Sequence, residues 1–327
     1  MKLTKFIPLT LSALCAIASC KKSGGPVHPH TPSTGDTDVY VAGFVAAINP
    51  VAAIWKNGIE TKLAETGKIS YANAIAVSGN DVYAAGSVSN DNASFPMAVY
   101  WKNGLLVKLS DNLPHSSANA IAVIGNDVYV AGSVNYVATM WKNGVATRLD
   151  PGNISEAFGL AVSGGDVYVS GYVYQGGTGS TPTYWKNGVE HNLNIDNDAS
   201  VAYAVAVSGN NIYLAGNENG YATLWKNGLP GILDNNTPAG DKFGLAINNN
   251  EVYAVSSNIP AYWKNGAKTI IPGYGFPDAI AFAGSDMYIA GAVPDGSPAA
   301  NVCYWKNGVL HEFGDGGNGA GIAVVVR

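Results

Sequence analysis

The chain comprises 327 residues, of which 18 are lysine or arginine and 23 are aspartate or glutamate, giving a formal net charge of −5 at pH 7. This mild acidity, with only two arginines (Arg148 and Arg327), disfavours nucleic acid as a partner, because nucleic-acid-binding proteins neutralise phosphates with clustered basic side chains. Of the three cysteines, only Cys303 lies in the region expected to fold, so no intramolecular disulfide is predicted there.

The first 20 residues are typical of an export signal. Lys2 and Lys5 give a basic start, and the apolar run 6–18 is too short to span a bilayer. The run Ile-Ala-Ser-Cys that ends at Cys20 resembles the lipobox of bacterial lipoproteins, in which a peptidase cuts before the cysteine and the new N-terminus is acylated. This resemblance implies a signal peptide over 1–19 and a lipid anchor on Cys20, with the bacterial outer membrane, on its periplasmic or cell-surface side, as the expected location. An ordinary signal peptide with a chance cysteine is the alternative.

Residues 20–37 are expected to form a flexible tether. They are rich in Pro, Gly, Ser and Thr and show no hydrophobic periodicity. His28 and His30 lie in this segment, but no cysteine or carboxylate stands at ligand spacing beside them, so a solvated linker is favoured over a metal site. Neither a metal nor another cofactor is predicted elsewhere, and a monomeric folded domain is expected over 38–327.

The tetrapeptide Trp-Lys-Asn-Gly occurs seven times and contains all seven tryptophans, at Trp55, Trp101, Trp141, Trp185, Trp225, Trp263 and Trp305. The copies recur about every 40 residues, a period typical of propellers and solenoids. Each repeat has four short β-rich runs, which in the second copy are 74–77, 82–86, 97–101 and 105–109. Gly-Asn and Asn-Gly pairs separate them and favour tight hairpins. Each repeat therefore predicts a four-stranded antiparallel sheet, without helix.

Seven such sheets predict an all-β fold, a seven-bladed β-propeller of four-stranded antiparallel blades. The first strand of each repeat alternates small and branched residues and is expected to lie innermost. The strand that begins with Asp-Val-Tyr has its first copy at Asp38, yet the run that should precede it is missing and occurs instead as 321–324. The C-terminal strand is thus expected to join the first blade and close the ring. An open β-solenoid is the alternative, but it would have no reason to leave complementary fragments at its ends.

The repeated side chains are interpreted structurally. Tryptophans would fill the gaps between blades. Each motif lysine would pair with the acid that opens the second strand, as Lys102 with Asp81. The alternative, a ring of lysines that attracts an anion, is disfavoured because most of these lysines have an acid nearby.

The connections between strands two and three, and between blades, are long and variable and share one face of the predicted disc, where binding usually resides. At the entrance to the inner strands on this face, one position differs in chemistry between repeats. The candidate ligand-binding residues at this position are Asn73, Asn119, Phe158, Tyr203, Phe243 and Asp278. Amides, aromatic rings and one acid suit a glycan or protein ligand. The aromatic members could instead fill gaps between blades.

The combination of a small-apolar strand, a strand ending in glycine, and an aromatic-Trp-x-x-Gly hairpin with a closing leucine such as Leu63 resembles bacterial extracellular HAF repeats and, more loosely, Kelch propellers. The resemblance covers 38–327, although Ala42-Gly43 replaces the double glycine of Kelch strands. It implies an extracellular repeat domain and no defined catalytic set, and the chain lacks the common hydrolase and phosphate-binding motifs, so no catalytic residue is predicted. A binding or scaffold propeller is expected; a polysaccharide hydrolase or lyase with a carboxylate such as Asp278 at the channel mouth is the alternative.

Overall fold

The computed structural model describes residues 37–45, 49–63, 68–89, 95–174, 176, 179–193, 199–273, 275–294 and 300–313. These belong to one compact unit, 37–327. They form 27 β-strands, and none of them belongs to a helix that could cross a membrane. The predicted signal peptide, Cys20 and the tether up to residue 36 lie outside the described residues.

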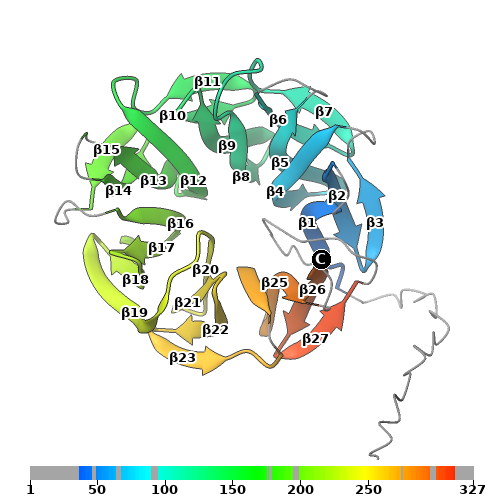
Figure 1. Ribbon diagram of the computed structural model, residues 1–327, viewed down its shortest axis with the longest axis vertical. Coiled ribbons are helices and arrows are strands. Elements are labelled where there is room, and N and C mark those ends of the chain that lie inside the picture. The colour runs from blue at the N-terminus through cyan, green and yellow to red at the C-terminus, as the bar shows by residue number, and fades with distance from the viewer. Residues whose placement is uncertain are drawn as a thin grey trace, which may run out of the picture. The chain divides into compact units, whose positions relative to one another are not determined.

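The strands form seven antiparallel sheets that stand as blades around a ring, numbered one to seven in chain order (Figure 1). The bounds are, in blade one, β1 (Tyr40–Val45), β2 (Val51–Lys56) and β3 (Ile59–Lys62); in blade two, β4 (Ile69–Ser78), β5 (Asp81–Ser89), β6 (Met97–Lys102) and β7 (Leu105–Lys108); in blade three, β8 (Ser117–Ile124), β9 (Asp127–Val134), β10 (Val137–Lys142) and β11 (Val145–Arg148); in blade four, β12 (Ile154–Ser163), β13 (Asp166–Tyr174), β14 (Ser180–Lys186) and β15 (Val189–Asn192); in blade five, β16 (Val201–Ser208), β17 (Asn211–Glu218), β18 (Tyr221–Lys226) and β19 (Leu229–Pro238); in blade six, β20 (Phe243–Asn248), β21 (Glu251–Ser256), β22 (Ile259–Lys264) and β23 (Ala267–Ile270); and in blade seven, β24 (Phe276–Ala283), β25 (Asp286–Pro294), β26 (Ala300–Lys306) and β27 (Val309–Glu312).

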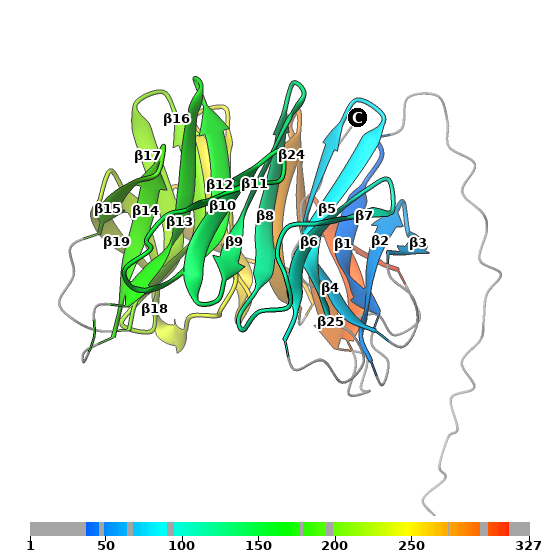
Figure 2. The same ribbon diagram turned by 90° about the horizontal axis from the view of Figure 1, so that it is seen from above.

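The first strand of each four-stranded blade lies innermost, as predicted. In Figure 1, β4, β8, β12 and β16 stand nearest the centre, and the first strands of neighbouring blades contact one another. The side view in Figure 2 shows these inner strands running side by side along the height of the ring. The outer strands β3, β11, β15 and β23 are exposed along their whole length. The core is therefore divided among the gaps between blades.

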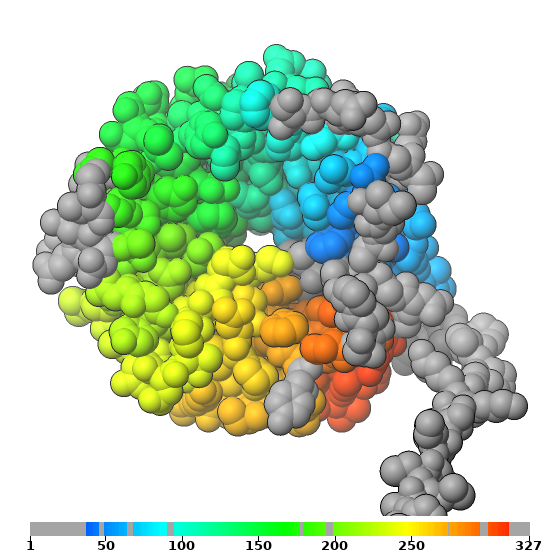
Figure 3. Space-filling view, in the orientation of Figure 1, coloured from blue at the N-terminus to red at the C-terminus, as the bar shows by residue number. Residues whose placement is uncertain are grey.

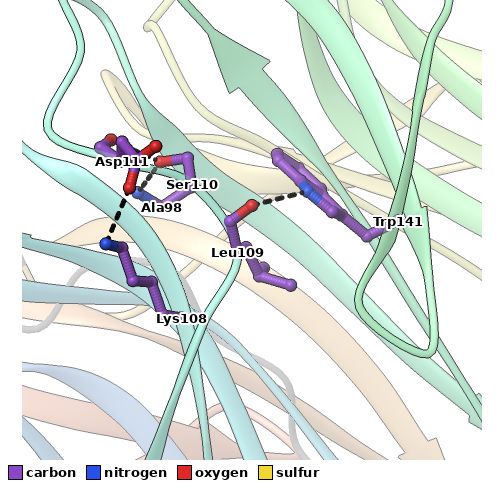
Figure 4. A network of polar contacts seen from close by, with 6 residues as sticks. All are labelled: Ala98, Lys108, Leu109, Ser110, Asp111 and Trp141. Carbon is purple, nitrogen blue, oxygen red and sulfur yellow. Dashed lines mark hydrogen bonds and ion pairs between the residues drawn. The ribbon is translucent and has the colours of Figure 1, made fainter.

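Each gap between neighbouring blades holds one hydrophobic cluster with one tryptophan. All seven tryptophans are at most 2% exposed, which confirms their prediction as core. In the gap between blades two and three, Trp141 packs with Ile121, Val128 and Val130, and its Nε1 donates a hydrogen bond to the Leu109 carbonyl of the preceding blade at 3.1 Å (Figure 4). The tryptophans thus join one blade to the next.

The described residues also show how blade seven meets blade one. Trp55 of blade one packs with Tyr288, Ala290 and Val302 of blade seven, and it stacks on Phe313 with ring centroids 6.5 Å apart. The ring is closed by this seventh gap. The run 321–324, predicted to complete blade one as its innermost strand, lies outside the described residues.

The other residues of the tetrapeptide form and stabilise the turn between strands three and four. Asn103 and Gly104 both have positive φ, 51° and 80°, as a type I′ hairpin requires. The Asn103 amide accepts a hydrogen bond from Val82 N (2.8 Å) and donates one to Asp81 (2.7 Å), and Lys102 forms an ion pair with the same carboxylate at 2.8 Å. Six blades contain this lysine–acid pair, which confirms the structural interpretation.

Blade five is the exception to this pairing. Asn211 stands where the other blades have an acid, so among the described residues Lys226 contacts no carboxylate and lies over the Tyr213 ring, 5.6 Å from its centroid. The turn is nevertheless the same, because Asn227 still accepts from Ile212 N at 2.8 Å. The hydrogen bonds of the asparagine, rather than the ion pair, are therefore common to these turns.

Candidate functional site

Five of the six candidate binding residues occupy β-bulges in the inner strands. The register of each first strand against its second strand shifts by one residue, and the residue left without a partner is Asn73, Asn119, Phe158, Tyr203 or Asp278. A bulge inserts one extra residue and re-aims its side chain. The same local irregularity therefore recurs where the chemistry of the blades differs most.

A glycine near the end of the second strand, two or three residues before its last residue, explains these bulges. A Cβ on Gly216 would lie 2.0 Å from the Val201 carbonyl oxygen, a distance that no side chain can occupy. Gly86, Gly132, Gly171 and Gly291 stand in equivalent close contacts of 1.9–2.0 Å. Blade six has Ser256 at this position, and there Phe243 pairs with Ser256 in regular register. The glycine therefore permits the close backbone approach on which the bulge depends.

All six candidate residues line one cavity on the axis of the ring, with a volume of about 440 Å³. This volume falls in the range of roughly 300–1,000 Å³ typical of ligand pockets. The space-filling view shows the opening at the centre (Figure 3). The lining comes from the early and middle residues of the inner strands and from Asp241 and Lys242, which precede β20. The cavity therefore reaches the end of the ring where the connections between blades enter the inner strands.

The two asparagines form a polar wall that also joins blades. Asn73 Nδ2 donates to the Ala118 carbonyl at 3.1 Å, and Asn119 Nδ2 donates to the Ala157 carbonyl at 2.9 Å. Asn119 also contacts Glu156 Oε1 at 3.5 Å. Burial raises the pKa of Glu156 above its ordinary value, with the Asn119 hydrogen bond opposing the shift. The amide nitrogens thus hold neighbouring blades together, which the sequence did not indicate.

Three aromatic rings from successive blades form the opposite wall. The Phe158 and Tyr203 centroids are 4.9 Å apart, and Tyr203 stacks nearly parallel on Phe243 at 5.7 Å. Phe243 is 8% exposed and belongs to the cluster between blades five and six, so it packs in the gap as the alternative interpretation expected. Phe243, with Tyr203 packed against it, therefore both lines the cavity and fills the gap between blades five and six.

Asp278 is a buried acid in this cavity. It is 7% exposed, and its only polar contact among the described residues is an ion pair with Lys242, whose Nζ lies 3.8 Å from Oδ2. Burial raises the pKa of Asp278 from 3.8 to about 6; Lys242 opposes the shift and the charge of Asp241 adds to it. Asp241, Lys242 and Glu156 were not among the candidates, although each stands one or two residues before a cavity residue in the chain.

We expect Asp278→Asn to stabilise the protein near neutral pH. Because the folded-state pKa lies above the unfolded value, the ionised buried carboxylate costs stability above pH 6, and this cost disappears below about pH 4, where both states are protonated. The rise of the pKa from 3.8 to about 6 corresponds to a gain of up to about 3 kcal/mol at pH 7.5. Urea unfolding at pH 7.5 and pH 4 measures it.

Asp286→Asn is the matched control in the same blade. The hydrogen bond from Lys306 lowers the pKa of Asp286, so the ionised carboxylate stabilises the folded state above its unfolded pKa, and that contribution is lost as the pH falls. This variant is expected to lose stability near neutral pH. A gain in the control, or a gain in Asp278→Asn that does not depend on pH, would contradict the assignment.

The described residues define a seven-bladed β-propeller with a chemically uneven cavity on its axis, and none of them form a group of three or more His, Cys, Asp and Glu side chains placed to hold a metal ion. No family model matches the chain, and no curated protein matches it. The resemblance to HAF and Kelch repeats therefore stays a prediction.

One similar solved structure comes from a structural and mechanistic study of two prolyl endopeptidases and the role of inter-domain dynamics in their catalysis and specificity. It aligns with 89% of this chain and 50% of that chain, at 11% identity and a TM-score of 0.48. This chain thus spans about half the length of that one. At this level of similarity we infer nothing about activity.

Proposed function

We propose that this protein is a binding propeller whose ligand enters the axial cavity from the face with the long connections. One observation carries the proposal: a position of the inner strand that varies chemically between blades is brought to one cavity in six blades. The repeated residues of the tetrapeptide, by contrast, are engaged in the core and in the turns. Conserving a scaffold and varying its lining is the arrangement expected of a recognition site.

The ligand that this cavity suits is the narrow end of a glycan or of a protein segment. The aromatic wall offers apolar surface, and the amide and carboxyl groups offer hydrogen bonds that orient a polar ligand. We also propose that the domain is displayed outside the cytoplasm on a lipid anchor at Cys20. Incorporation of palmitate that persists in Cys20→Ser would contradict that anchor.

The test of binding is a glycan and peptide array screen of the purified protein. Tyr203→Leu is expected to weaken binding of any ligand found by at least about tenfold, because Tyr203 is the middle ring of the aromatic wall and such contacts at the centre of a site dominate affinity. Tyr213→Leu is the control, since Tyr213 lies on β17 under Lys226 and does not line the cavity. Equal losses in the two variants would assign Tyr203 a structural role only.

A second candidate function rests on Asp278. A buried acid whose pKa is raised to about 6 has the property of a general acid near neutral pH. The hypothesis of a polysaccharide hydrolase or lyase therefore predicts product release in the same screen and its loss in Asp278→Asn. Bound glycan that is recovered unmodified would reject it.

A further inference from the structure

Among the described residues at the axial cavity, carboxylates outnumber cations. Asp241 and Asp278 line it, and Glu156 lies beside it on β12, in contact with the lining residue Asn119. Among the described residues that line the cavity, Lys242 is the one lysine or arginine. A concave site with this balance attracts cations and repels anions, since low-dielectric walls focus the field of its charges.

Within the described part of the chain, no donor lies within 3.5 Å of the buried Asp278 carboxylate. Its ion pair with Lys242 at 3.8 Å is beyond hydrogen-bond distance, and no other described residue donates to it. Buried carboxylates are usually satisfied by donors, and the cost of leaving one without them is large. Its place in the lining of the cavity means that a ligand can supply the missing N–H donors.

The aromatic wall favours the same kind of ligand. Ring faces attract cations, and the effect is stronger where water is excluded. The negative field of the carboxylates reaches this wall. The pKa of Tyr203 is raised to about 12, mainly by burial and further by the charges of Asp241 and Glu156. An ammonium group placed between the rings and Asp278 would be stabilised by both.

Further polar atoms in the cavity distinguish an amino sugar from a simple amine. Among the described residues, Asn73 Oδ1 and the Tyr203 hydroxyl have no hydrogen-bond partner, although both side chains line the cavity. An alkylamine would satisfy only the carboxylate. A sugar ring with a free amino group also carries hydroxyls for these two atoms and an apolar face for the aromatic wall.

We propose that the axial cavity recognises an amino sugar with a free, positively charged amino group, held by Asp278 and the wall formed by Phe158, Tyr203 and Phe243. This inference rests on the proposed function and names the ligand class for the same site. The protonated amine donates to the Asp278 carboxylate, and the sugar hydroxyls bind Asn73 and Tyr203.

Calorimetric titration of the full-length protein tests this with three β-1,4-linked disaccharides that differ only at C2, built from glucosamine, N-acetylglucosamine or glucose. The glucosamine disaccharide is expected to bind at least about tenfold more tightly than the other two, the factor that a charge-assisted hydrogen bond supplies. Asp278→Asn should abolish this preference. Asp286→Asn, which removes a carboxylate of the same blade outside the cavity, should keep it.

Cadaverine, a diamine without a sugar ring, separates charge from sugar recognition. Cadaverine binding as tight as that of the glucosamine disaccharide would overturn the amino-sugar assignment, as would equal affinity for the three disaccharides or an unchanged preference in Asp278→Asn. If the disaccharides fail to bind while the array yields another ligand that depends on Tyr203, this inference fails and the proposed function stands. If neither the disaccharides nor any ligand on the array binds, both this inference and the proposed function are contradicted.

Discussion

Replacing Gly216 with alanine is expected to destabilise the propeller by more than about 3 kcal/mol, because overpacking against a fixed backbone atom lies at the upper end of steric costs. The new Cβ would lie 2.0 Å from the Val201 carbonyl oxygen and 3.0 Å from the Ala202 Cα, so the two strands must separate. Separation removes the bulge that carries Tyr203 and moves that ring away from Phe158 and Phe243. Urea unfolding and ligand titration measure the two effects.

Gly228→Ala is the control for the general cost of replacing glycine. Gly228 lies in the turn of the same blade with φ of 84°, and nothing lies within 4 Å of its Cβ position. Its replacement costs about 1 kcal/mol of backbone strain and leaves the cavity unchanged. If the two variants were equally stable, the close approach at Gly216 would not be what holds the bulge.

Trp141→Ala is expected to cost about 4 kcal/mol, since removing a fully buried tryptophan leaves a cavity as well as losing transfer free energy. Trp141 is 0% exposed, fills the gap between blades two and three, and donates its Nε1 hydrogen to Leu109 (Figure 4). Thermal unfolding of this variant should show a large decrease in the melting temperature.

Lys142→Ala tests how much the next residue of the same tetrapeptide contributes to stability. Lys142 pairs with Asp127 at 2.7 Å, but both side chains are well exposed, and exposed pairs contribute little. The loss should be a small fraction of that for Trp141. A comparable loss in the two variants would contradict the division of the tetrapeptide into a core residue and a surface residue.

The ring of blades could be predicted from the sequence because each repeat contains the residues that determine its own hairpins and core. The Asn-Gly pair determines the hairpin because both residues adopt positive φ. The regular spacing of the tryptophans predicts one buried tryptophan for each gap between neighbouring blades. The pairing of Lys102 with Asp81 follows from strand order alone. These are local or strictly periodic features, and seven copies make each of them visible.

The shape of the site required information that one repeat does not contain. The candidate position was identified because its chemistry varies, but its bulge depends on a backbone contact across two strands, such as Gly216 with Val201. The glycine had been noted only as the end of a strand. Likewise, Lys242 reaches Asp278 from the neighbouring blade, and the burial that shifts the Asp278 carboxyl depends on how two blades meet.

The bulge has a consequence for how such a protein changes over evolutionary time. A residue that has no partner in the strand ladder can be exchanged without breaking that ladder, and the same backbone already accommodates Asn, Phe, Tyr and Asp in five blades. Each of these five blades thus contributes one position to the wall of the cavity whose side chain can change without altering the strand pairing. New specificities can arise by substitutions at these positions, one blade at a time.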